Sequence, residues 1–320
     1  MSAPAPLRLG IIGTGGILER FLPGADRAPS VEVVAIASRD RQRARAFASE
    51  RGIGRAYGGY DELLADQDVD AVYICLPNSM HHAWTMRALA AGKHVVAEKP
   101  YSFHPDEPVA AHDAADRAGL VLTEGFMWRH TPHALRFVEL LPAVGELRTI
   151  RSTFSFNIAS DIDIRLDASL EGGSLADVGT YCVNAARLVA GREPQTAFGL
   201  AEIGRSGVDE RFSGILDFGD GLVGTFTCGF RSEHATLEAI GSAGSLRLVG
   251  PFAGRATVIS GPDGETLVES VNPYELELED FAAAVRGEHP QRLGRSDAVG
   301  QTRALAALQE SARTHCAVDC

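Results

Sequence analysis

The chain has 320 residues, of which 45% are apolar and 22% are charged, a composition typical of a globular protein of about two domains. Its 42 acidic and 30 basic side chains give a formal net charge of −12, which argues against a nucleic-acid partner because such binders carry a basic face. The sequence holds no apolar run of about 18 residues, so we expect no membrane span. Five cysteines are scattered and odd in number, which fits neither a disulfide framework nor a zinc site and favours the reducing cytoplasm.

The first 125 residues alternate short apolar runs with helical stretches. Five of these runs predict strands: Leu7–Ile12, Val31–Ala37, Ala71–Cys75, His94–Ala97 and Leu120–Thr123. Helical stretches lie between them, such as Arg41–Arg51, which Gly52 closes. Strand and helix in alternation predict a parallel sheet covered on both faces. We therefore expect residues 1–125 to form a doubly wound α/β domain of the Rossmann type.

The pattern changes after Gly125. Residues 150–158 alternate apolar and polar side chains with a period of two, which predicts a strand with one apolar face. Glycine-containing turns at 219–221, 241–244 and 261–264 predict hairpins. Helices resume at residues 274–285, where we expect the acidic run Glu275, Glu277, Glu279 and Asp280 to form a solvated face, and again near Ser296. Residues 126–320 are thus predicted to form an α+β domain with an open, largely antiparallel sheet.

A glycine-rich turn follows the first predicted strand. Gly13, Thr14, Gly15, Gly16 and Ile17 lie between that strand and the next helix. Glycines there allow backbone N–H groups to approach a pyrophosphate at the helix N-terminus. The usual dinucleotide-binding fingerprint has a third glycine where this chain has Leu18, so the spacing of the glycines alone is weak evidence. The location of the turn directly after the first strand is what indicates dinucleotide binding.

The residues after the second strand indicate which nicotinamide cofactor binds. An acidic residue at this place binds the ribose 2′-hydroxyl of NAD, whereas an arginine accommodates the 2′-phosphate of NADP. Here Ser38 and Arg39 stand at that place, and Arg43 follows one helical turn later. Asp40 is able to cap the following helix. We therefore predict a preference for NADP(H) over NAD(H), and the alternative reading of Arg39 is a solvated loop residue.

Lys99 ends another strand, between Glu98 and Pro100. Ligands of open α/β sheets bind outside the carboxyl ends of the strands. A lysine at this place suits proton transfer or polarisation of a carbonyl. A surface turn explains the same residues equally well.

Five segments in order resemble the Gfo/Idh/MocA family of oxidoreductases. The segments are Gly13–Ile17, Leu76–His81, Glu98–Pro100, Glu124–Arg129 and Gly172–Tyr181. Their order and spacing along nearly the whole chain are much more specific than any one of them. The chain is most similar to the branch with dihydrodiol dehydrogenases and NADP-dependent xylose or glucose dehydrogenases, and sugar 3-ketoreductases of deoxysugar biosynthesis are similar too.

The resemblance implies roles for particular residues. Lys99 occupies the position of the lysine near the reacting carbon, before a proline whose peptide bond is commonly cis in the family. Tyr181 occupies the position of the proton donor or acceptor, and Asp177 lies one helical turn before it. Many inositol dehydrogenases have a histidine at the place of Tyr181 and an aspartate three residues later, where this chain has Asn184. That departure favours the dihydrodiol and aldose branch.

Further residues enter the site through the same resemblance. Those expected at the cofactor are Leu76, Pro77, Asn78, His81, Glu98, Lys99, Pro100, Trp128 and Arg129. Arg165 is expected to reach substrate hydroxyls together with Asp177 and Tyr181. No metal ligands are expected. From the apolar strand face we expect Phe154 and Phe156 to belong to the core and not to a substrate platform.

These features predict an NADP(H)-dependent oxidoreductase acting on a secondary alcohol or hemiacetal carbon of a sugar or cyclic diol. A tyrosine has an ordinary pKa of about 10, and a lysine cation nearby favours the phenolate. The alternatives are a sugar 3-ketoreductase of deoxysugar biosynthesis and a regulator that binds NADP without turnover. We also expect a homodimer or tetramer, with the apolar stripes of residues 150–158 and 222–230 as candidate contact area.

Overall fold

The computed structural model describes residues 4–160 and 162–320 and divides the chain into two compact units. The first unit contains residues up to 102, 106–127 and 272–298, and the second contains 103–105, 128–271 and 299–320. The predicted domain boundary, between residues 125 and 126, lies close to residue 127, after which the chain passes from the first unit into the second. Residues 272–298, however, were assigned to the second domain and belong to the first unit. The reason is that helix α8 (Pro273–Val285) packs on helix α1 (Leu18–Ala25), where the Tyr274 and Phe21 rings are 5.8 Å apart.

The first unit holds a parallel sheet of six strands. They are β1 (Leu7–Ile12), β2 (Val31–Ala37), β3 (Arg55–Tyr57), β4 (Ala71–Ile74), β5 (His94–Glu98) and β6 (Leu122–Gly125), in the order β3-β2-β1-β4-β5-β6. The five predicted strands are confirmed within two residues, and β3 was not predicted. The strand order reverses between β1 and β4, and in such sheets the ligand crevice lies at that reversal, beyond the carboxyl ends of the strands.

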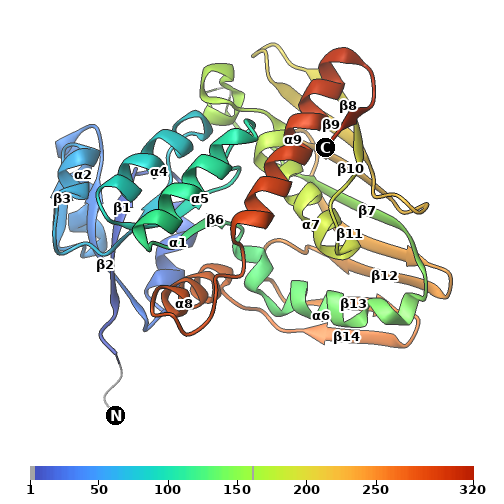
Figure 1. Cartoon of the computed structure of the whole chain (residues 1–320), viewed down its shortest axis with the longest axis horizontal. Helices are drawn as coiled ribbons and strands as arrows, with labels where there is room; N and C mark the ends of the chain where they lie inside the picture. The colour runs from blue at the N-terminus through green and yellow to red at the C-terminus, as the bar shows by residue number, and fades with distance from the viewer. Residues whose placement is uncertain (1–3, 161) are drawn as a thin grey trace. The chain divides into compact units, whose positions relative to one another are not determined.

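Helices cover both faces of this sheet. They include α2 (Arg41–Arg51), α3 (Tyr60–Leu64), α4 (His81–Ala90) and α5 (Asp106–Ala118). Helices α4 and α5 run side by side (Figure 1) and share one buried cluster with α3 and the strands. Helices α1 and α8 contact β2, and the ring of Phe21 stacks on Tyr73 of β4 at 3.8 Å. The doubly wound architecture predicted for this part is confirmed.

Glu277 of α8 is a buried acid, contrary to the solvated face predicted for its acidic run. Its side chain is 1% exposed, and neither carboxyl oxygen has a hydrogen-bond partner among the described residues. Burial, with the charges of Glu98 and Asp280, raises the pKa of Glu277 well above its usual range. An acid with a raised pKa stays protonated in the folded chain at a pH where the unfolded chain has lost that proton.

Replacement of Glu277 by glutamine is therefore expected to stabilise the protein at neutral pH. As pH rises above about 4.3, the unfolded wild type releases a proton that the folded state keeps, and wild-type stability falls by up to about 1.4 kcal/mol per pH unit until the folded carboxyl also ionises. The amide does not titrate, so Glu277→Gln escapes this loss. Urea unfolding at several pH values checks this, with Glu275→Gln of the same helix as the control. Parallel stability curves for Glu277→Gln and wild type would contradict it.

The second unit is built on one nine-stranded sheet. Its strands are β7 (Leu147–Ser155), β8 (Thr196–Ile203), β9 (Asp209–Asp217), β10 (Val223–Gly229), β11 (His234–Gly241), β12 (Gly244–Val249), β13 (Thr257–Gly261), β14 (Gly264–Val268) and β15 (Val318–Asp319). The order is β14-β13-β12-β11-β7-β10-β9-β8-β15, and the pairing of β7 with β10 is parallel while the other described pairings are antiparallel. The predicted hairpins and largely antiparallel sheet are confirmed.

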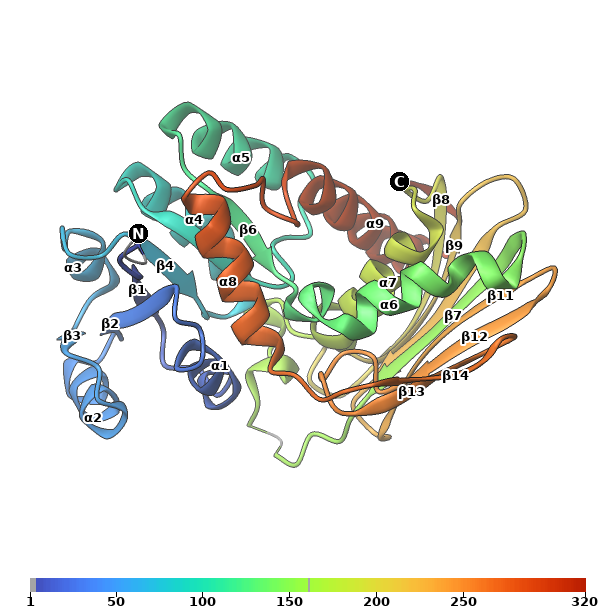
Figure 2. The same ribbon diagram turned by 90° about the horizontal axis from the view of Figure 1, so that it is seen from below.

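Helices lie on one face of this sheet. Figure 2 shows α6 (Pro132–Leu140), α7 (Thr180–Ala190) and the later part of α9 (Arg295–Thr314) on that face, and the described residues place no helix on the other. Several apolar side chains of the two predicted stripes, such as Ile150 and Phe226, are buried, and others, such as Phe154 and Phe156, are partly buried. The outer face instead carries a row of uncharged side chains across the strands: Leu200, Ser213, Thr227, Thr153, Thr236 and Val249. The stripes therefore belong mostly to the core, because the apolar period turns them toward the helices.

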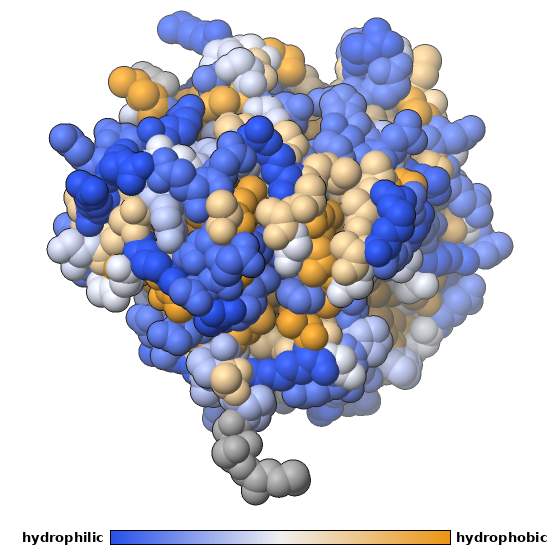
Figure 3. All heavy atoms as spheres, turned by 60° about the vertical axis from the view of Figure 1, so that its left-hand side comes forward, coloured by the Kyte–Doolittle hydropathy of each residue, from blue (hydrophilic) through white to orange (hydrophobic). Residues whose placement is uncertain are grey.

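Among residues 4–160 and 162–320, no helix is both long enough and apolar enough to cross a membrane. Hydrophilic side chains predominate on the face of the molecule in Figure 3, and apolar ones appear between them.

Candidate active site

The glycine turn after β1 is fitted tightly against the neighbouring strand. Gly13 has a φ of +111°, and a Cβ there would lie 2.9 Å from the carbonyl oxygen of Cys75. Glycine is therefore required at this position. Leu18 and Glu19 donate backbone hydrogen bonds to Gly15 and Gly16, so the turn leads directly into α1. The N–H groups of a helix start have no acceptor within the helix, which makes this turn suitable for a pyrophosphate.

The residues after β2 lie next to that turn. Nη2 of Arg43 donates to the carbonyl oxygen of Thr14 at 3.0 Å, which brings the start of α2 to the glycine turn. Arg39 is exposed, and Ser38 is buried beside it. The carboxylate of Asp40 caps α2 by accepting from the N–H groups of Gln42 and Arg43 at 2.7 and 3.2 Å. Asp40 is thus engaged by the helix backbone, and contact of Arg39 and Arg43 with a 2′-phosphate stays a prediction.

His81 acts as a brace between two turns of the site. Its Nε2 lies 2.8 Å from the carbonyl oxygen of Leu76, and its Nδ1 lies 2.8 Å from the carbonyl oxygen of Pro100. The side chain is 1% exposed, and burial lowers its pKa although the two carbonyls oppose that effect. Because both ring nitrogens face the backbone, the position supports a role in holding the turns and not in contacting the cofactor. Pro77 and Asn78 complete the first of these turns and are partly exposed.

Lys99 stands at the carboxyl end of β5. The Lys99–Pro100 peptide bond is cis, as the resemblance implied, and the Lys99 side chain is partly exposed. Glu98 before it is buried and accepts a short hydrogen bond from the hydroxyl of Tyr73. Cys75 lies under the glycine turn, and burial raises its pKa to about 12, so its thiol stays protonated. Of Glu98, Lys99 and Cys75, Lys99 is thus the one whose side chain is partly exposed.

Tyr181 lies in the first turn of α7, in the second unit. The π-helical turn Leu175–Gly179 precedes it. Its ring is 5.4 Å from the ring of Phe154 on β7 and 5.3 Å from that of Phe252. Phe154 is therefore part of the aromatic surround of Tyr181. Lys99 belongs to the other unit, so its pairing with Tyr181 stays a prediction.

A salt bridge connects Arg165 and Asp177, two residues that were both predicted to lie at the substrate. Nε of Arg165 donates to the Asp177 carboxylate at 2.8 Å, and Nη1 lies 3.2 Å from both carboxylate oxygens of Asp163. The guanidinium also lies over the ring of Phe156, 5.6 Å from its centroid. The sequence offered no signal for Asp163, because an Asp two residues before an Arg in a loop is not a recognised pattern.

Two residues expected at the cofactor have other surroundings in the second unit. Trp128 is fully buried, with its ring 5.3 Å from that of Phe252. Arg129 donates from Nη1 to the side-chain oxygen of Asn184 at 3.2 Å. Their positions thus lend no support to direct cofactor contacts. Asn184 is in turn connected to Gln301 of α9 at 3.4 Å, so it has a structural partner here.

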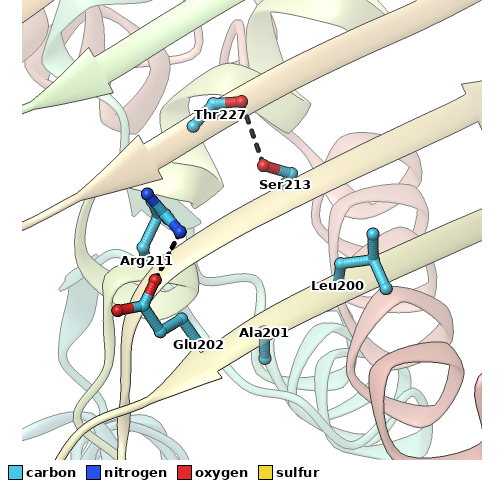
Figure 4. A pocket seen from close by; sticks show the side chains of 6 residues that line it. All are labelled: Leu200, Ala201, Glu202, Arg211, Ser213 and Thr227. Carbon is cyan, nitrogen blue, oxygen red and sulfur yellow. Dashed lines mark hydrogen bonds and ion pairs between the residues drawn. The ribbon is translucent and has the colours of Figure 1, made fainter.

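A shallow pocket on the outer face of the nine-stranded sheet holds none of the predicted site residues (Figure 4). Its lining includes an ion pair between Glu202 and Arg211, at 2.5 Å, and a hydrogen bond between Ser213 and Thr227, at 3.1 Å. Within the described residues no cluster of three His, Cys, Asp or Glu side chains is arranged for a metal ion.

Known proteins resemble the chain over nearly its full length. The D-xylose 1-dehydrogenase (NADP(+)) 2 of Haloferax volcanii is 38% identical over 98% of this chain and 99% of its own. The trans-1,2-dihydrobenzene-1,2-diol dehydrogenase of Sus scrofa is 34% identical over 77% of this chain and 75% of its own. The crystal structure of a 3-ketoreductase from Actinomadura kijaniata with NADP and TDP-benzene is 32% identical, has a TM-score of 0.90, and matches 96% of this chain and 98% of its own.

Family models divide the chain much as the structure does. The model of an oxidoreductase family with an NAD-binding Rossmann fold matches residues 7–126, and that of the GFO/IDH/MocA C-terminal domain matches residues 142–247. Since these matches cover more than half of the chain, the resemblance of the five segments is confirmed: the chain belongs to the Gfo/Idh/MocA family of oxidoreductases.

Proposed function

We propose that the chain is an NADP(H)-dependent dehydrogenase acting on a secondary alcohol or hemiacetal carbon of a sugar or related cyclic diol. The observation that carries the cofactor assignment is the placement of Arg43 beside the glycine turn, with Arg39 exposed after β2 and Asp40 engaged by the helix. The xylose dehydrogenase relative is named for NADP, and the similar ketoreductase structure contains it. The tight fit of Gly13 against Cys75 agrees with a turn that keeps space for a phosphate.

When bound, NADP supplies the hydride acceptor, and NADPH the donor for the reverse reaction. The chain supplies the proton chemistry. Tyr181 takes the hydroxyl proton during oxidation, and Lys99 as a cation favours the phenolate form. Arg165 is held by Asp177 and Asp163, which fixes it for hydrogen bonding to substrate hydroxyls. Because a positioned base and a charge suffice for this step, the proposal requires no metal ion.

A second candidate is the reverse reaction on a ketosugar, as in the 3-ketoreductases. The similarity to the Actinomadura kijaniata structure favours it. A regulator that binds NADP without turnover is disfavoured, because Lys99, Asp177 and Tyr181 are all present and a sensor needs no proton transfer.

A spectrophotometric screen at 340 nm tests the proposal. NADP and NAD are each combined with aldoses, inositols and trans-dihydrodiols, and ketosugars are offered with NADPH. We expect reduction of NADP by an aldose or a dihydrodiol and little by inositols. Tight NADPH binding without turnover of any class would favour the regulator.

We also propose that the outer face of the nine-stranded sheet pairs between subunits, forming a dimer or tetramer. Leu200 and Ile215 are 53% and 46% exposed on that face, and exposed aliphatic side chains on a helix-free sheet face mark a contact surface. Ile215→Glu is expected to shift the sedimentation mass toward that of the 34.0 kDa chain, because it buries a charge in the contact. Leu135→Glu, on α6, is the control. A wild-type mass near 34.0 kDa at micromolar concentration would contradict the proposal.

A further inference from the structure

The helical segment that carries Tyr181 begins without a cap of its own. Ser174 precedes the π-helical turn Leu175–Gly179, has helical backbone angles, and makes no side-chain hydrogen bond that caps the turn. The first N–H groups of a helix have no acceptor within the helix, so they need one from outside. Asp209, the first residue of β9, provides it: its Oδ2 accepts from the N–H of Leu175 and from the hydroxyl of Ser174, both at 2.7 Å.

A bulge in β9 turns Asp209 toward this helical segment. Asp209 and Arg211 pair with two consecutive residues of β8, so Glu210 between them is an additional residue. Arg211 lies on the outer face of the sheet, in the lining of the shallow pocket (Figure 4). In a regular strand, residues two apart share a face. The additional residue instead places Asp209 on the face that the helices cover.

Gly173 makes room for the carboxylate of Asp209. Its φ is +119°, and a Cβ at this position would clash with Oδ1 of Asp209. Glycine is therefore required here by the backbone conformation and by the close approach of the carboxylate. The carbonyl oxygen of Gly173 accepts from the N–H of Asp177 at 3.0 Å. The residues that Asp209 holds are thus bonded directly to the backbone of Asp177.

The neighbouring strand β10 holds the π turn from another side. A Cβ on Gly179 would lie 2.8 Å from Sγ of Cys228, and that thiol donates to the carbonyl oxygen of Ser174 at 3.4 Å. Within the turn, the N–H of Thr180 donates to the carbonyl oxygen of Leu175, five residues earlier. Such bonds are rare and occur mostly as single turns within α-helices, frequently at functional sites. Relaxation to an α-helical bond would shift the register by one residue, which corresponds to a rotation of about 100°.

From these contacts we propose that Asp209 is a positioning residue for Tyr181. Its carboxylate fixes the start of the π turn, and the turn fixes the orientation in which α7 presents the Tyr181 hydroxyl. The inference rests on the proposed function, because it concerns the proton transfer assigned to Tyr181. It adds to that function a residue of another strand, which acts through the helix and not by contact with the substrate.

Asp209→Ala removes the acceptor and is expected to lower kcat by about 10–100-fold, because a small displacement of a catalytic group slows the reaction strongly. NADPH is expected to bind almost as in wild type, since the residues expected to hold the nucleotide lie in the first unit. Asp217→Ala is the matched control, because Asp217 ends the same strand and accepts from the N–H of Gly219 at 2.8 Å. A wild-type kcat in Asp209→Ala, or an equal loss in Asp217→Ala, overturns the proposal.

A double variant with Tyr181→Phe distinguishes positioning from general damage to the fold. If Asp209 acts through the Tyr181 hydroxyl, Asp209→Ala lowers kcat by less than about threefold once that hydroxyl is absent. An equal loss with and without the hydroxyl overturns the proposal, because damage to the fold does not depend on the hydroxyl.

Ser174→Ala is the milder variant if Asp209→Ala does not fold. It removes one of the two hydrogen bonds to Asp209 and leaves the one from the Leu175 N–H. It is expected to lower kcat by about threefold or more, and to have almost no effect in the Tyr181→Phe background. A wild-type kcat in Ser174→Ala, or the same loss in both backgrounds, overturns the proposal.

Amide hydrogen exchange keeps this inference separate from the proposed function. Peptides covering residues 173–181 are expected to exchange at least about tenfold faster in Asp209→Ala than in wild type, since loss of the acceptor promotes local opening. Asp217→Ala is expected to leave their exchange unchanged. Wild-type exchange in Asp209→Ala overturns the inference even if sugars are oxidised. Wild-type turnover in Tyr181→Phe overturns the proposed role of Tyr181, and the exchange result still decides whether Asp209 holds the turn.

Discussion

Tyr181→Phe is expected to lower turnover by about 10²–10⁴-fold while NADPH binds almost as in wild type. This is the usual effect of removing a positioned acid–base group. The ring remains, so its contacts with Phe154 and Phe252 are kept. The residues expected to hold the nucleotide phosphates lie in the first unit and are unchanged. Steady-state rates at 340 nm and a fluorescence titration with NADPH measure the two quantities.

The control is Tyr57→Phe, whose hydroxyl donates to Asp66 in the first unit. It is expected to keep wild-type turnover. Lys99→Met should also lose turnover, and the double variant should lose much less than the product of the single losses, since the two groups act as a unit. If Tyr181 carries the proton, oxidation in wild type rises with pH through an ionisation that Tyr181→Phe abolishes. The same ionisation in Tyr181→Phe, with a rate within a few-fold of wild type, would transfer the role to Lys99.

Arg39→Ala is expected to weaken the use of NADP by about 10–150-fold and to change the use of NAD little. The range corresponds to losing one charge-assisted contact to the 2′-phosphate, about 1.5–3 kcal/mol. Arg39 is exposed at the end of β2. NAD lacks the phosphate, so its binding has no such contact to lose. The ratio of kcat/KM for the two cofactors measures the effect.

Arg41→Ala is the matched control for this prediction, because Arg41 lies two residues later and pairs with Glu62 at 2.7 Å. It should leave the cofactor ratio unchanged. An equal loss for both cofactors in Arg39→Ala, or a preference of the wild type for NAD, would refute the assignment.

Local patterns predicted most of the first unit. Apolar runs bounded by turn residues located its five longer strands, and Asp40 proved to be the helix cap that its position before Arg41 indicated. Strand β3 escaped prediction because its three residues, Arg55–Tyr57, have no apolar period. The family motifs identified site residues by their place in the sequence. They did not predict which side chains these residues contact in the fold.

The remaining errors concern long-range packing. The helical period of residues 274–285 predicted helix α8. It did not predict that the side of the helix with Tyr274 packs on α1, so neither the unit to which α8 belongs nor the burial of Glu277 was predicted. The expected place of His81 at the cofactor stays a prediction, and only the fold shows that the carbonyl oxygens of Leu76 and Pro100 lie at its ring nitrogens. The pairing of Asp163 with Arg165 likewise depends on loop geometry, which no periodicity encodes.

Transfer of deuterium from substrate to cofactor tests the central claim most directly. A substrate identified in the 340 nm screen is prepared with deuterium at every carbon and incubated with the enzyme and NADP. The mass of the reduced cofactor is then measured by mass spectrometry. Direct transfer from the alcohol or hemiacetal carbon predicts NADPH heavier by one mass unit, and the label should form at least about 10²-fold more slowly with Tyr181→Phe. Reduced cofactor without deuterium, or labelling that Tyr181→Phe leaves at the wild-type rate, would contradict the account.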